Sequence, residues 1–173
     1  MKKLTFAFLS IFLVLFSLKS ANAQSTIGQA QAVFMYNFTR LIEWPADYKS
    51  GDFIIGVYGS SEVYNEVKTF CSGKMVGSQP ITVTRFSNAD DIGKCHIVFI
   101  AYGKSKEIGA ISSKISGNKT LIISERKGAL DDGSAINFVV IDDKLKFELK
   151  ASNGIKYGLK IHSNLESMAV AKY

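Results

Sequence analysis

The chain has 173 residues, 47% of them hydrophobic, and a formal net charge of +6. Half of this charge comes from Lys2, Lys3 and Lys19, which lie in an N-terminal segment without acids, so the rest of the chain carries only +3. The remaining lysines are scattered between acids, which argues against the basic stripe with interleaved aromatic residues that nucleic-acid binding requires.

Residues 1–23 have the layout of a cleaved secretory signal. Lys2 and Lys3 precede an almost wholly apolar run that ends at Leu18, and Ala-Asn-Ala at 21–23 supplies the small residues of a cleavage site. The apolar run is shorter than the ~20 residues that span a bilayer. We therefore expect cleavage between Ala23 and Gln24, export of the chain, and one domain formed by residues 24–173.

The mature chain begins with a predicted amphipathic helix over residues 27–43, in which apolar residues recur at intervals of three and four. Pro45 ends this helix, because a proline disfavours helical geometry at the residue before it. Arg40 falls off the apolar face. Trp44, at the end of the helix, is either a lid on the core or an anchor for a partner, since tryptophan is common in both places.

Strands and helices then alternate along the chain. Apolar and β-branched runs predict strands, and three-to-four spacing predicts helices. The pattern gives strands over 53–59, 81–86, 95–102 and 120–124, helices over 60–70 and 106–115, and a hairpin of 135–141 with 144–150, followed by helices over 151–157 and 164–171. This order predicts an α/β fold: a mostly parallel sheet with helices on both faces and a C-terminal antiparallel β-hairpin at one edge.

The turn Gly59-Ser60-Ser61 joins a predicted strand to a predicted helix and has two interpretations. A serine there can cap the helix, or the free backbone N–H groups can hold a small anionic ligand. The turn lacks the third glycine of a dinucleotide-binding loop and the Gly-Lys-Ser/Thr ending of a phosphate-binding loop. Both interpretations stay open at this point.

Two cysteines, Cys71 and Cys95, remain in the mature chain. An even number in an exported protein favours a disulfide, and the predicted topology brings the end of one helix and the start of one strand to the same sheet edge. The cysteine spacing fits no zinc pattern. Neither His96 nor His162 completes a ligand set, so we expect no metal.

Residues suited to catalysis do not gather into a motif. Pairs of aspartates occur at 90–91, 131–132 and 142–143, where adjacent acids are typical of turns. No Gly-x-Ser-x-Gly nucleophile motif is present, and neither histidine lies in a recognisable catalytic pattern. We therefore expect a protein that is not an enzyme.

Six short segments occur in the order used by one known family: YNFTRLIEWP, CHIVFI, TLIIS, GSAINFV, KFEL and GLKIHSNL. The chain thus resembles the YfiR/HmsC-like family of periplasmic regulators over nearly its whole mature length. This resemblance implies a periplasmic protein without cofactor that binds and represses a membrane-bound signalling protein through its periplasmic region. The implied target is a diguanylate cyclase, which would link the chain to cyclic di-GMP and biofilm control.

The alternative is a periplasmic small-molecule-binding sensor that acts with a sensor kinase or another receptor, and a homodimer stays open in either case. The family usually reads Phe-Glu-x-Asn where this chain has Phe147-Glu148-Leu149-Lys150, and Cys71 lies outside the shared segments. Strand alternation directs Glu148 away from the core. We expect the partner surface to use Glu148 together with Arg40, Glu43 and Trp44 of the first shared segment.

Overall fold

The computed structural model describes the backbone of residues 22–173 and the side chains of residues 27–173. The predicted signal segment lies outside the residues with described side chains, so its cleavage between Ala23 and Gln24 stays a prediction. In the described part of the chain, no helix combines the length and apolar character needed to cross a lipid bilayer.

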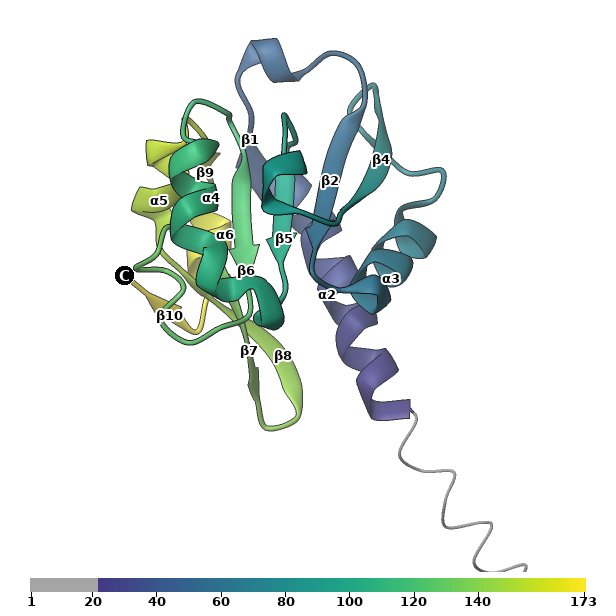
Figure 1. Cartoon of the computed structure of the whole chain (residues 1–173), viewed down its shortest axis with the longest axis vertical. Coiled ribbons are helices and arrows are strands. Elements are labelled where there is room, and N and C mark those ends of the chain that lie inside the picture. Colours follow the sequence, from purple (N-terminus) through teal and green to yellow (C-terminus); the bar gives the residue numbers. More distant parts are fainter. Residues whose placement is uncertain (1–21) are drawn as a thin grey trace, which may run out of the picture.

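An eight-stranded mixed sheet runs through the molecule in the order β10-β8-β7-β6-β5-β2-β4-β3 (Figure 1). Neighbours are parallel except for the pairs β7 with β8 and β3 with β4, which are antiparallel. The strands are β2 (Phe53–Tyr58), β3 (Met75–Val76), β4 (Gln79–Phe86), β5 (Ile97–Ile100), β6 (Leu121–Ser124), β7 (Ile136–Ile141), β8 (Lys144–Leu149) and β10 (Ala171–Lys172).

Helices cover both faces of this sheet. One face packs against α2 (Asn22–Leu41), α3 (Ser61–Cys71) and α6 (Ser163–Met168), and buries side chains such as Phe38, Val67 and Leu165. The other face packs against α4 (Ile108–Lys114), with Ile108 and Ile111 in its core. A short helix α5 (Ala151–Lys156) follows the hairpin. The predicted α/β fold with a mostly parallel sheet is confirmed.

The first predicted helix ends earlier than expected. Helix α2 stops at Leu41, and Ile42–Glu43 forms a short strand, β1, antiparallel to β9 (Lys160–Ile161). The His162 N–H donates to the Leu41 carbonyl at 3.1 Å. The end of the helix is therefore set by a partner from the C-terminal part of the chain, as well as by the following proline.

The predicted hairpin forms, but it is not the outermost element of the sheet. Ala171, predicted as the last residue of the final helix, begins β10 instead, because the N–H groups of Val170 and Tyr173 bond to the Phe147 and Leu149 carbonyls of β8. The hairpin turn at Asp142 and Asp143 has positive φ at both residues, as a two-residue turn requires.

The hairpin also projects beyond its neighbour. Strand β6 pairs with β7 only at Ile123↔Ile136 and Ser124↔Asn137, whereas β7 continues along β8 to Ile141. The hairpin therefore extends past the edge at which the parallel strands end, and Figure 1 shows it standing out from the sheet. We call this the carboxyl edge, and the opposite one the amino edge.

Candidate functional site

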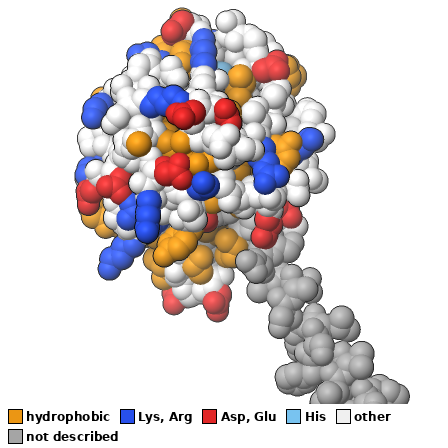
Figure 2. Space-filling model, viewed as in Figure 1, with side chains coloured by type: hydrophobic (Ala, Val, Ile, Leu, Met, Phe, Trp, Pro, Cys, Tyr) orange, Lys and Arg blue, Asp and Glu red, His pale blue; other side chains and the backbone are white. Residues whose placement is uncertain are grey.

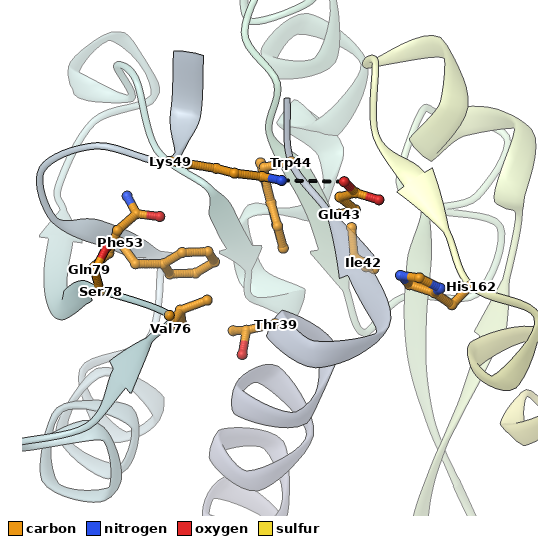
Figure 3. A pocket seen from close by; sticks show the side chains of 11 residues that line it. Thr39, Ile42, Glu43, Trp44, Lys49, Phe53, Val76, Ser78, Gln79 and His162 are labelled. Carbon is orange, nitrogen blue, oxygen red and sulfur yellow. Dashed lines mark hydrogen bonds and ion pairs between the residues drawn. The ribbon is translucent and has the colours of Figure 1, made fainter. Parts of the chain in front are cut away.

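The first candidate site is a pocket of ≈ 340 Å³ at the amino edge, which we call the Trp44 pocket. The starts of β2 and β4, strand β1 and the turn after β3 contribute its walls. Figure 3 shows Phe53 and Val76 at one end and His162 at the other. The residues around it are Thr39, Ile42, Glu43, Trp44, Lys49, Phe53, Val76, Gly77, Ser78, Gln79 and His162.

Trp44 is held in the wall of this pocket by aromatic packing. Its side chain is only 4% exposed, and its ring meets the Phe53 ring edge to face at a centroid distance of 5.0 Å. The indole Nε1 is buried without a hydrogen-bond partner among the described residues. Of the two interpretations of Trp44, the structure therefore shows core packing, in a position that also borders a cavity.

Glu43 is held by two lysines beside the pocket. Its carboxylate lies 3.3 Å from Lys49 Nζ and 3.5 Å from Lys160 Nζ, the second of which comes from the paired strand β9. The hydrogen bond from Lys49 and the attraction of Lys160 lower the pKa of Glu43. The Glu43 carboxylate is exposed, so these ion pairs add little to the stability of the fold. The two lysines nevertheless compensate its negative charge.

His96 lies behind the pocket and is held in the neutral form. The Ile54 N–H donates to its Nδ1 at 3.0 Å, and its Nε2–H donates to the Tyr48 carbonyl at 2.8 Å. Its ring also stacks on Phe53 at 4.2 Å. Burial, more than any other effect, lowers the pKa of His96. His96 is thus a satisfied core residue that supports the wall of the pocket.

The second candidate site is a groove of ≈ 410 Å³ at the carboxyl edge, which we call the hairpin groove. It lies between the start of α2, the segment after β6 and the projecting hairpin. The residues that border it are Ile27, Gln31, Glu125, Lys127, Asn137, Phe138, Val139, Val140, Leu145 and Glu148. It stands where parallel strands end, the usual place for binding sites in such folds.

Buried amide groups hold the two acids of this groove. Asn137, 1% exposed, donates to Glu148 Oε2 at 2.9 Å and accepts from Ser124 Oγ at 2.9 Å. Gln31, also buried, donates to Glu125 Oε2 at 2.7 Å. Neither acid forms an ion pair with any side chain that the structure describes.

The four residues predicted for a partner surface are thus separated by the fold. Glu43 and Trp44 border the Trp44 pocket, whereas Glu148 lies in the hairpin groove at the other edge of the sheet. Arg40 is exposed on the last turn of α2, where its guanidinium lies 5.0 Å from the centroid of the Tyr36 ring. The structure therefore does not bring the predicted set together.

The Gly59 turn has the structure of a helix cap. Ser60 Oγ accepts from the Val63 N–H at 3.2 Å, and α3 begins at Ser61. Gly59 has a φ of 91°, and a β-carbon there would lie 2.5 Å from Lys104 Cγ, so glycine is required. Ligand binding at this turn stays a prediction, with Lys104 packed over it.

The predicted disulfide between Cys71 and Cys95 is not formed, and both residues are free, buried thiols. Topology places them near one sheet edge, but Cys71 packs in the core beneath α2 and α3, and Cys95 packs in the core beneath α4. The sheet therefore lies between the two thiols. Burial raises the pKa of Cys71 to about 11 and that of Cys95 to about 12, which leaves both unreactive.

Sequence reasoning missed Glu125, the second acid of the groove, and the two amides that orient the acids, Asn137 and Gln31. Asn137 carried a usable signal, because it is a lone amide inside an apolar strand and such a residue needs a partner. Gln31 and Glu125 are far apart in the sequence and gave no such signal. Among the described side chains, no group of His, Cys, Asp and Glu could hold a metal ion.

Comparison with known proteins places the chain in a family. The model of the YfiR/HmsC-like family matches residues 28–170, so the chain belongs to this family, as its short segments had suggested. No curated protein matches the sequence significantly. Both candidate sites lie within the matched residues apart from Ile27 at the rim of the groove.

Proposed function

From its membership of the YfiR/HmsC-like family, we propose that the chain is a periplasmic regulator that works by binding and not by catalysis. It binds the periplasmic region of a membrane-bound signalling protein and represses it. The most direct target is a diguanylate cyclase, so that the chain lowers cyclic di-GMP and biofilm formation. Export through the predicted signal segment would deliver the chain to that compartment.

The observation that carries this proposal is the surface around Glu148. The carboxylate is held by the buried Asn137, and the neighbouring hairpin tip exposes two apolar side chains, Val140 at 56% and Ile141 at 39%. Figure 2 shows hydrophobic side chains gathered on this projecting part, with acidic side chains at its end. A positioned charge beside exposed apolar groups is typical of a protein-binding surface.

The test combines deletion of the gene with replacement of Glu148. We expect deletion to raise cyclic di-GMP, and the wild-type chain, but not Glu148→Arg, to lower it again. The tagged wild-type chain should also capture a membrane-bound cyclase or receptor from the envelope. Glu166→Arg, an acid on α6 outside both candidate sites, is the matched control and should repress normally.

Two results would count against the proposal. One is an unchanged cyclic di-GMP level after deletion, together with no captured receptor. The other is full repression by Glu148→Arg, which would remove Glu148 from the partner surface. Circular dichroism must show that this variant is folded, because a loss of fold would also abolish repression.

The Trp44 pocket favours a second candidate function, a small-molecule sensor that acts with a receptor. Its volume of ≈ 340 Å³, its apolar walls and its few polar groups suit a small ligand. A panel of amino acids and nucleotides should then contain a compound that raises the melting temperature of the wild-type chain but not of Val76→Trp, which fills the pocket. No stabilising compound would argue against this function.

A further inference from the structure

The wall of the hairpin groove contains an unpaired strand edge. In an antiparallel pair, the backbone groups of alternate residues point away from the partner strand, so β8 can satisfy only part of β7. Beyond Asn137, no strand in the described part of the chain other than β8 pairs with β7, and none of the described turn or loop backbone hydrogen bonds reaches Val139–Ile141. The groove thus offers free N–H and C=O groups where β6 has stopped.

The groove also carries negative charge that the described basic side chains do not compensate by ion pairs. Glu125 and Glu148 accept hydrogen bonds from amides, but neither meets a basic side chain of residues 27–173 in an ion pair. Lys127 also borders the groove and is likewise outside every ion pair found in the described chain. Two positioned acids against one lysine leave a net negative site, which attracts a basic partner and repels anionic lipid.

From these two features we propose that the hairpin groove takes an extended segment of the partner protein. The segment pairs with the free edge of β7 and sets arginine or lysine side chains against Glu125 and Glu148. Side chains of an extended strand alternate between two sides, so basic residues can face the acids while apolar residues in between pack on Val140 and Leu145. This inference rests on the proposed regulatory function and specifies how the partner is recognised.

The probe is a capped six-residue peptide of alternating arginine and valine, labelled for fluorescence anisotropy, added to the mature chain. We expect binding that weakens about tenfold or more when the arginines are replaced by glutamate, because the charge-assisted hydrogen bonds are lost. Methylation of alternate backbone nitrogens should weaken binding as strongly, because it removes the donors needed to extend the sheet. Binding should also fall as salt is raised.

On the protein side, the double variant Glu125→Gln with Glu148→Gln removes both charges and keeps one amide oxygen at each position, which can accept from Gln31 and Asn137. Glu125→Gln loses the second acceptor, which the Tyr102 N–H uses at 2.9 Å. The affinity of the double variant for the peptide should fall about tenfold or more. Glu166→Gln is the matched control and should bind as the wild type does. Equal binding by the double variant, insensitivity to backbone methylation, or no binding by the wild-type chain would each overturn the inference.

Receptor capture from the envelope separates this inference from the proposed function. If the peptide binds as expected but the chain captures no receptor, the groove is still a site for extended basic segments, but the proposed regulatory function is wrong. If the double variant captures the receptor as well as the wild type does, the regulatory function remains and the groove is not the recognition site. Self-association that is abolished by the double variant would identify a second copy as the occupant instead.

Discussion

The two edges of the sheet treat their acids differently. At the amino edge, Glu43 is neutralised by Lys49 and Lys160, and Trp44 is packed into the core. At the carboxyl edge, Glu148 is oriented by the buried Asn137 and takes part in none of the ion pairs among the described side chains. The amino edge compensates its charge within the fold, whereas the carboxyl edge leaves two acids outside the described ion pairs and one side of β7 without a strand partner in the described chain. This contrast separates a largely structural region from the region that we propose for recognition.

Replacement of Trp44 should have the largest effect on stability. Trp44→Ala removes a ring packed on Phe53 and leaves a cavity, so the free energy of unfolding should fall by about 3–5 kcal/mol. Denaturant unfolding measures this loss. Tyr102→Ala, which removes an exposed aromatic side chain, should change it by no more than about 0.5 kcal/mol. A small effect of Trp44→Ala would show that the amino edge is not part of the packed core.

Replacement of Asn137 should have a smaller effect on stability but should also impair recognition. Asn137→Ala removes the acceptor of Ser124 Oγ and the donor to Glu148, so we expect a loss of about 1–3 kcal/mol and weaker binding of the arginine-valine peptide. Asn88→Ala, at an exposed Asn–Asp contact, is the control. Peptide binding unaffected by Asn137→Ala would mean that the orientation of Glu148 is unimportant.

Acid should destabilise the amino edge through His96. Burial lowers the pKa of His96 in the folded chain, so the unfolded chain, with an ordinary pKa of about 6.5, binds the proton more readily. The stabilising contribution of the neutral ring is therefore complete above pH 6.5 or so and decreases as the pH falls below that value. Melting temperatures between pH 7.5 and 5 test this.

The matched comparison for the pH effect is His96→Gln, in which His162 is retained. Its melting temperature should depend less on pH over the same range than that of the wild-type chain. Equal dependence in the two proteins would assign the effect to other groups. Protonation of Glu43, whose pKa is lowered, belongs to a more acidic range and does not interfere.

The smallest expected effect is that of a reducing agent on the melting temperature. Both thiols are free and lie in different cores, so a reducing agent should leave the melting temperature unchanged. A disulfide closing this loop would contribute about 3 kcal/mol or more in the chain-entropy model, so its loss would be visible. A lower melting temperature under reducing conditions would show that Cys71 and Cys95 form a disulfide in solution.

Short-range sequence patterns predicted the elements whose structure depends mainly on neighbouring residues. Alternation and β-branching marked the strands from β2 to β8, except the two-residue β3, and the pair Asp142-Asp143 marked the hairpin turn. Strands β1, β9 and β10 were missed, because each has two residues and exists only through a distant partner such as Ile161. The disulfide prediction was wrong because the order of the elements places both cysteines near one edge of the sheet but does not say on which face each thiol lies.

The candidate sites were predictable to a lesser degree. Alternation correctly turned Glu148 away from the core formed by Phe147 and Leu149. Glu148 lies at the opposite edge from Trp44 because β7 begins only where β6 ends, and no short segment specifies this register. The free edge of β7 was also invisible, because it results from the length of β6 relative to the hairpin and not from any residue type.

The pairing of β1 with β9 has a consequence for the order of folding. Ile42 and Ile161 are separated by most of the described chain, so a large entropy of loop closure opposes their contact until the sheet between them has formed. A nascent chain that lacks its last residues has no β9 and cannot complete this corner of the molecule. We therefore expect the β1–β9 corner beside the Trp44 pocket to form late in folding, whereas the hairpin, built from neighbouring residues, can form early.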